Sequence, residues 1–323
     1  MNHSFLIETL RSIVAASVPL IYAGIGETLT ERAGVVNLSL DGSILLAAMT
    51  GFAVAYLTGW LWLALLAAMV VGALVAGLVA YANIELRQNQ VAIGLTLTLL
   101  CADLSSFLGK PFMHQPGPGV APRPLPVLSA IPGVGPILFD QNALAYGSYL
   151  LLIGAWIWVS RTQAGLNLRA VGERPEAAFA RGIDVNRLRY LYTLIGGALV
   201  GLAGASYSLS VKLGWSHRHT AGVGWIALAI VIFGGWHPLR VAFGAYLFGA
   251  LRALGGILQP IFPTVPTQIF QAAPFALMVM VLLLVGIDAG RIEIYFPRWL
   301  RPLYRGLLGG SPPAALGQRF DKP

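Results

Sequence analysis

The chain has 323 residues, of which 57% are hydrophobic and 11% are charged, and its mean hydropathy is +0.73. A soluble domain carries about 25% charged residues, so the composition excludes an ordinary soluble protein and predicts an all-α polytopic membrane protein. Apolar runs recur almost from end to end, and we therefore expect a single transmembrane domain over residues 1–323. The net charge of +8 does not indicate a nucleic-acid partner, because the basic residues form no patch on a soluble face.

A membrane-spanning helix needs about 20 mostly apolar residues. Nine segments meet this requirement fully or nearly: 12–28, 35–58, 60–83, 91–109, 143–160, 188–210, 222–235, 239–258 and 267–287. We expect about nine transmembrane helices, with a range of eight to ten. The range arises because 12–28 and 222–235 are short or interrupted by glycine, and either is compatible with a re-entrant segment.

The loops differ in their content of Lys and Arg, which concentrate on the cytoplasmic side of a membrane. If the cytoplasmic loop 161–187 is counted with its flanking Arg189, as residues 161–189, 15 of the 21 Lys and Arg residues fall inside and five fall outside. This orientation also places a basic tail, 288–323, in the cytoplasm and the N-terminus outside. The proline-rich loop 110–142 then lies outside, either as a lid or docking surface for an extracytoplasmic partner or as a plain connector.

The polar segment 165–187, GLNLRAVGERPEAAFARGIDVNR, contains the signals that start and stop a short helix. Pro175 suits the first helical turn, where its missing N–H costs nothing. Gly182 suits the left-handed position that closes a helix, and Asp184 or Asn186 suits the cap of the next one. The pattern predicts a cytoplasmic helix of about two turns, which is too short to be stable alone.

Such a helix, with small residues and one aromatic side chain, Phe179, is suited to a groove on another protein. The other interpretation is an ordinary cytoplasmic loop that is basic because of its location.

Four stretches resemble one protein family. They are GLNLRAVGERPEAAFARGIDVNRLRYLYTLIGGALVGLAGA, GETLTERAGVVNLSLDGSILLAAMTGF, LFDQNALAY and GVGWIALAIVIFGGWHPLRVAFGAYLFGAL. Together they resemble permease subunits of bacterial ABC importers, in the family that carries ribose, branched-chain amino acids and nucleosides. The resemblance covers most of residues 20–290 and is strongest to the nucleoside-type branch. Asp41 stands where that branch usually has Glu, and Arg181 stands where a smaller residue is commoner.

The resemblance implies that the short helix is a coupling helix, held in a cleft of a separate ATPase subunit. That role falls on Gly172, Glu173, Arg174, Pro175, Glu176, Ala177, Ala178, Phe179, Ala180, Arg181 and Gly182. The resemblance also implies a second, homologous permease subunit in a heterodimer, an extracytoplasmic substrate-binding lipoprotein, and a location in the bacterial inner membrane. ATP and Mg²⁺ would bind to the partner ATPase.

Catalytic motifs are missing from the sequence. None of the lysines, Lys110, Lys212 and Lys322, stands in a G-x-x-x-x-G-K-[ST] loop, so we expect no ATPase site, no cofactor and no enzymatic activity in this chain. The alternating pair His217 and His219 is a poor basis for a metal site, and we expect none.

Polar residues within apolar spans are candidates for function. Asn37 and Asp41 are four residues apart and would share a helical face if 35–58 were helical throughout. With Glu27, they are predicted to line the substrate pathway, and the pair of Asn37 and Asp41 could hydrogen-bond a ribose hydroxyl or a base edge. Equally, Asp41 can cap a helix or pair with Arg32.

Three further polar residues lie at or within apolar segments. Asn89 and Gln90 stand at the start of a predicted helix, where capping is the expected role. Asp103 lies inside a predicted span, and the sequence indicates no role for it.

Two other kinds of function compete with nucleoside import. The first alternative is a permease for ribose or another simple sugar. The second is an ion-coupled secondary transporter that uses Asp41 and Glu27 as ion sites, although the inverted repeats expected of that class are not evident. A membrane-embedded enzyme is disfavoured by the missing catalytic motifs.

Overall fold

The computed structural model describes residues 3–220, 222–286 and 310–321. Its long helices are α1 (His3–Arg32), α2 (Leu40–Thr58), α3 (Leu61–Ile84), α4 (Gln90–Gly109), α6 (Ala143–Arg161), α9 (Val185–Ser206), α11 (Pro238–Ile261) and α12 (Thr267–Gly286). The shorter elements are η1 (Lys110–Phe112), η2 (Leu128–Ala130), α5 (Val134–Leu138), α7 (Gln163–Glu173), α8 (Pro175–Ala180), the π-helical turn η3 (Tyr207–Val211) and α10 (Val223–Phe233).

Seven helices are long and apolar enough to cross a membrane within the described residues, and two apolar stretches, Val223–Phe233 and Thr267–Met280, are shorter. These nine segments confirm the predicted all-α polytopic class. Residues 12–28 belong to the 30-residue helix α1, so the re-entrant alternative for them was wrong. Residues 222–235 contain only the 11-residue α10, which is too short to span a bilayer.

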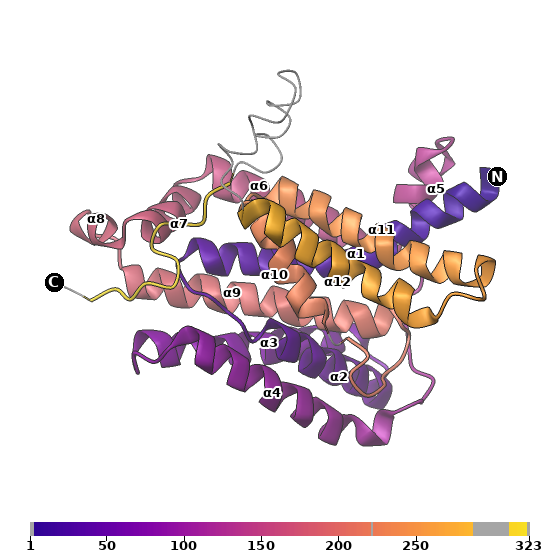
Figure 1. Cartoon of the computed structure of the whole chain (residues 1–323), viewed down its shortest axis with the longest axis horizontal. Helices are drawn as coiled ribbons and strands as arrows, with labels where there is room; N and C mark the ends of the chain where they lie inside the picture. The colour runs from indigo at the N-terminus through magenta and orange to yellow at the C-terminus, as the bar shows by residue number, and fades with distance from the viewer. Residues whose placement is uncertain (1–2, 221, 287–309, 322–323) are drawn as a thin grey trace.

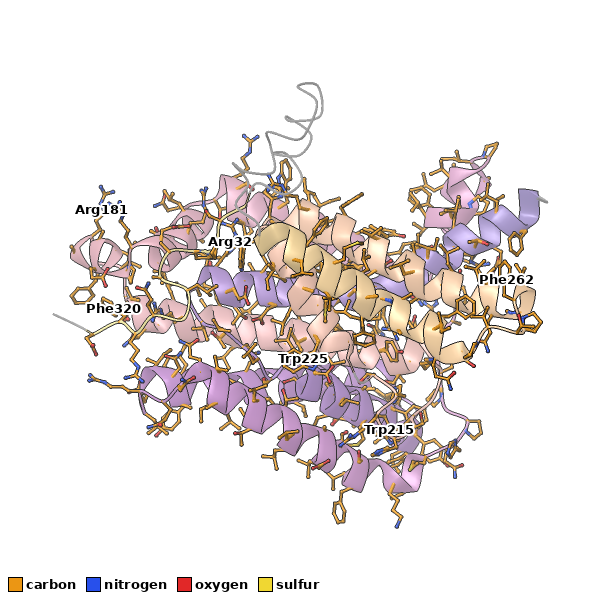
Figure 2. All side chains as sticks on the ribbon, viewed as in Figure 1. Arg32, Arg181, Trp215, Trp225, Phe262 and Phe320 are labelled. Atoms are coloured by element: carbon orange, nitrogen blue, oxygen red, sulfur yellow. The ribbon has the colours of Figure 1, made fainter. Side chains whose placement is uncertain are left out.

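The long helices run broadly along one direction (Figure 1). The helices α7 and α8 and the C-terminal residues 310–321 lie together at one end, which we call the α8 end. The N-terminus, α5 and the turn between α11 and α12 lie at the opposite end. Side chains mark the two ends as well, with Arg181 and Phe320 at the α8 end and Phe262 at the other (Figure 2).

The helices α1, α3 and α9 form the centre of the bundle. Helix α9 packs along both α1 and α3, while α11 covers α1 on another side and α2 packs against α3, α4 and α9. Tight packing of small and branched residues excludes lipid from this centre. Largely buried residues from α1, α2 and α9 fill it, including Ile21, Ile44 and Val200.

The proline-rich loop 110–142 contains only short helical turns, as its composition predicted. Its Asp140 forms an ion pair with Arg11 of α1 at 3.3 Å, and the Val120 N–H donates to the Leu209 carbonyl at 2.9 Å. The loop is therefore fixed to the bundle at the end opposite α8. Of the predicted basic tail, residues 288–309 and 322–323 lie outside the described residues.

Candidate functional site

Helix α2 begins inside the bundle, and residues 33–39 link it to the end of α1. The link 33–39 is not helical, and the Thr98 hydroxyl donates to the Leu38 carbonyl at 2.8 Å. Thr98 lies eight residues into α4, which corresponds to about 12 Å along the helix axis. The hydrocarbon core of a bilayer is about 30 Å thick, so α2 begins near its middle.

Helix α10 begins at the same depth, because its first turn contacts the first turn of α2. The Gly224 N–H donates to the Asp41 carboxylate at 3.0 Å, and the two residues are 183 positions apart in the chain. A Cβ atom at Gly224 would collide with the backbone of Leu40 and Asp41. The N-termini of two helices, each with a partial positive charge, therefore meet at one buried carboxylate, and we call this contact the Asp41 junction.

The structure separates Asp41 from the pair formed by Glu27 and Asn37. The Asn37 N–H donates to the Glu27 carboxylate at 3.2 Å. The Asn37 side-chain oxygen accepts from the Ser39 N–H at 3.1 Å and from its hydroxyl at 2.6 Å, and Ser43 continues the network. Asn37 precedes α2 and lies in the link, so the expectation of a shared helical face with Asp41 was wrong.

The remaining polar residues from the sequence have structural partners. Asn89 caps α4 by accepting from the Val91 and Ala92 N–H groups, which confirms its expected role. Gln90 instead accepts from the Val36 N–H at 2.7 Å, which fixes the link.

The two remaining charged residues pair elsewhere than with Asp41. Arg32 donates to the Trp236 carbonyl at 2.6 Å, so the alternative pairing of Asp41 with Arg32 is not formed. Asp103 forms an exposed ion pair with Arg218 at 3.4 Å.

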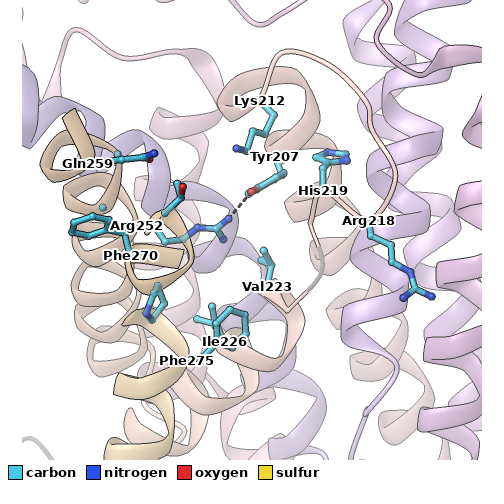
Figure 3. Close-up of a pocket in the computed structure, with 14 residues that line it drawn as sticks. Tyr207, Lys212, Arg218, His219, Val223, Ile226, Arg252, Gln259, Phe270 and Phe275 are labelled. Carbon is cyan, nitrogen blue, oxygen red and sulfur yellow. Dashed lines mark hydrogen bonds between the residues drawn. The ribbon is translucent and has the colours of Figure 1, made fainter. Parts of the chain in front are cut away.

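A pocket of about 440 Å³ opens beside the Asp41 junction, between η3, α10, α11 and α12 (Figure 3). Its lining includes Val223 and Ile226 from the first turn of α10, so the pocket borders the helix that Asp41 caps. Aromatic and cationic side chains form most of the remaining lining: Tyr207, Lys212, Arg218, His219, Arg252, Phe270 and Phe275, with Gln259 and Thr267. The pocket thus combines ring faces with hydrogen-bond donors, as small-molecule sites usually do.

Arg252 is the central charge of this pocket. Its guanidinium lies over the Tyr207 ring, 5.1 Å from the ring centre, and donates to the Tyr207 hydroxyl. Among the described residues it forms no ion pair. Arg252 was not among the residues predicted to line the substrate pathway, although an arginine in the interior of an apolar span was the signal that could have identified it.

His219 contributes a neutral ring to the pocket lining. Its Nδ1 lies 2.9 Å from the Ser216 carbonyl, so this nitrogen carries the hydrogen and Nε2 has a free lone pair. Within the described chain, Nε2 is buried and makes no hydrogen bond. Burial lowers the pKa of His219 to about 4, and the ring is therefore neutral near pH 7.

At the α8 end, the short helix has the boundaries that the sequence predicted. Helix α8 begins at Pro175, ends at Ala180, and is followed by Gly182 at φ 82°, which confirms its closing position. Asp184, rather than Asn186, caps α9 by accepting from the Arg187 N–H. Helix α7 directly precedes α8 and includes Gly172 and Glu173.

The predicted coupling residues divide into a buried group and an exposed group. Pro175 and Ala178 are buried, and Ala178 packs against Val171 and Val185. The exposed group comprises Glu173, Arg174, Glu176, Ala177, Ala180, Arg181 and Gly182.

Gly172 and Phe179, also predicted as coupling residues, contact distant parts of this chain. Gly172 is buried against the carbonyl of Arg32. Phe179 is half-buried, and its ring centre lies 5.6 Å from that of Phe320. Its contact with a partner ATPase stays a prediction.

A polytopic helical bundle with a polar, aromatic pocket next to interrupted helices is the architecture of a membrane transport protein. The family described as the permease component of branched-chain amino acid transport systems matches residues 9–285. The chain belongs to this family and is a permease of the ABC transporter class.

Several relatives are similar over nearly their whole length. A putative glucose ABC transporter permease of Haloferax volcanii is 35% identical, over 93% of this chain and 98% of that protein. A nucleoside ABC transporter permease of Lactococcus lactis subsp. cremoris is 34% identical, over 86% of this chain and 93% of that protein. A guanosine ABC transporter permease of Bacillus subtilis is 33% identical, over 86% and 92%. No solved structure matches the chain at a significant level.

Proposed function

We propose that this permease imports nucleosides, and that the pocket beside the Asp41 junction is where the substrate binds on its way through the membrane. The observation that carries the proposal is the composition of this pocket, next to a helix that starts in mid-membrane. A nucleobase offers a flat ring and carbonyl or amide groups, and a ribose offers hydroxyl groups. The names of two relatives, which transport nucleosides and guanosine, support the same substrate class.

Each group in the pocket has a counterpart on a nucleoside. Phe270, Phe275 and Tyr207 offer ring faces on which a base can stack, and base–aromatic stacking contributes about 1–3 kcal/mol per base. Arg252 donates hydrogen bonds, and the Gln259 amide can both donate and accept them. The pocket volume of about 440 Å³ is within the usual range for small-molecule sites.

We infer that the exposed face of α8 contacts a separate ATPase subunit in the cytoplasm. Ala177 and Ala180 leave this face flat, and Glu176 and Arg181 supply charges at its two ends. Closure of the ATPase on ATP would displace α8 and switch the permease between outward and inward openings. ATP and Mg²⁺ bind to that partner in this scheme, and this chain hydrolyses nothing itself.

The full importer would contain two further kinds of subunit. An extracytoplasmic binding protein delivers the substrate to the end opposite α8, where the loop 110–142 contacts the pocket-forming η3 through the hydrogen bond from Val120 to Leu209. A second, homologous permease completes a heterodimer. The C-terminus and the α8 end are cytoplasmic, in agreement with the distribution of Lys and Arg.

The test is ATPase activity of the complex reconstituted in liposomes with its binding protein, measured against a panel of nucleosides and monosaccharides. We expect purine or pyrimidine nucleosides to stimulate hydrolysis and to accumulate inside. Stimulation by free monosaccharides alone would contradict the nucleoside proposal. That result would favour the sugar alternative, which the glucose permease relative supports.

A further inference from the structure

The C-terminal residues 310–321 cross the α8 end and contact α7, α8, α9 and the link 33–39. We call this segment the C-terminal strap. Two of its backbone groups pair with distant elements: the Ala315 N–H donates to the Gly172 carbonyl at 2.9 Å, and the Gly317 N–H donates to the Gly34 carbonyl at 3.0 Å. The strap therefore joins α7 directly to the link.

A buried arginine of α9 forms a hydrogen bond to the strap. Arg189 of α9 is 2% exposed and donates from Nη1 to the Gln318 carbonyl at 3.0 Å. In the described part of the chain no carboxylate lies within ion-pair distance of this guanidinium. Hydrogen bonds from a charged donor are stronger than those between neutral groups, so this bond fastens the strap to α9.

The end of the strap covers the inner side of α8. The Phe320 ring packs on Phe179 at 5.6 Å and joins the small cluster formed by Val171, Ala178 and Val185. Glu173 accepts from the Ala314 N–H at 3.2 Å. The exposed pair between Arg87 and Asp321, at 3.3 Å, adds little because water and salt screen surface ion pairs.

Helix α8 has only six residues and is too short to keep its own position. We propose that the C-terminal strap positions α8 and connects it to the link 33–39, so that a displacement of α8 reaches the Asp41 junction. The link leads from the strap contact at Gly34 to Leu40, the first residue of α2. This inference rests on the proposed role of α8 as the contact with the ATPase.

The experiment compares Phe320→Ala with Arg319→Ala, an exposed neighbour, in the reconstituted complex. In Phe320→Ala we expect normal co-purification with the ATPase and normal basal hydrolysis. The maximal nucleoside-stimulated rate should fall about fivefold to tenfold, which is the effect of losing an aromatic contact. The nucleoside concentration for half-maximal stimulation should not change, because the pocket is intact.

Two more variants separate positioning from general stability. Phe320→Tyr keeps the ring and should restore the stimulated rate, and Ala315→Pro removes the N–H that donates to Gly172 and should lower it. Normal stimulated rates in both Phe320→Ala and Ala315→Pro would overturn the proposal. Loss of co-purification in both would also contradict it, because the strap is assigned no part in binding the ATPase.

Ala177→Glu, on the exposed face of α8, tests the underlying function independently. If Ala177→Glu abolishes association with the ATPase while the strap variants have the stimulated rate of the wild type, only the strap proposal fails. If it assembles and responds to nucleoside like the wild type, α8 is not the ATPase contact, and the proposed function fails whatever the strap variants show.

Discussion

The carboxylate of Asp41, in the first turn of α2, accepts a 3.0 Å hydrogen bond from the backbone N–H of Gly224, in the first turn of α10. Each helix begins with backbone N–H groups that have no partner inside the helix, and in mid-membrane water is scarce. Asp41 satisfies one of these donors across the bundle. The pocket lies against α10, so this one bond couples the shape of the pocket to the position of α2.

Asp41→Ala should weaken this junction and lower uptake. The Gly224 N–H would lose its acceptor, and an unsatisfied buried donor costs about 1–3 kcal/mol. Asp41→Asn keeps an oxygen acceptor at the same place and should retain most of the stability. The melting temperature of the purified complex measures the loss of stability, and uptake into proteoliposomes measures the loss of transport. Equal melting temperatures and equal uptake in Asp41→Ala and Asp41→Asn would show that the hydrogen bond is unimportant.

Arg252→Met should raise the nucleoside concentration needed for half-maximal stimulation by about tenfold, which corresponds to about 1.4 kcal/mol. The reason is the loss of the donor at the centre of the pocket, while methionine preserves apolar volume. Arg123→Met, an exposed change in the loop 110–142, serves as the control. An unchanged concentration dependence in Arg252→Met would remove this pocket from the substrate pathway.

Two neighbouring alanines of α8 should respond differently to the same substitution. Ala178 is 3% exposed, so Ala178→Glu buries a charge and should lower the melting temperature of the permease alone. Ala177 is exposed, so Ala177→Glu should leave that temperature unchanged and weaken co-purification with the ATPase by about tenfold or more. The reverse pattern would place the docking face on the other side of the helix.

The orientation of the chain can be tested with single cysteines in a Cys101→Ala background. Ala177 and Ala121 are both exposed in the structure, so accessibility to reagent depends only on the side of the membrane. An impermeant thiol reagent on intact cells should label Ala121→Cys and miss Ala177→Cys until the membrane is permeabilised. Labelling of position 177 alone would invert the proposed topology.

Stability should fall in acid partly because of His219. Its pKa in the folded protein is about 4, below the ordinary value of about 6.5, so the unfolded chain binds a proton that the folded chain does not. The resulting loss of folding stability is absent above about pH 6.5 and grows as the pH falls towards 4. When the pH is lowered from about 7.5 to about 5, the melting temperature of His219→Gln should fall by about 2–4 °C less than that of the wild type. An equal fall in the two proteins would contradict this role of His219.

The sequence alone was sufficient for features that depend on neighbours along the chain. The apolar segments follow from the thickness of the bilayer. The ends of α8 at Pro175 and Gly182 follow from the backbone preferences of those two residues, and the family follows from extended local similarity.

Only the tertiary structure brought together residues that are distant in sequence. The partner of Asp41 lies 183 positions away, and Asn37 proved to lie in a link rather than in a helix. The ring that contacts Phe179 comes from Phe320, near the C-terminus. In each case a side chain finds its partner only after the helices have packed, because contacts between distant segments depend on the whole bundle and not on local preference.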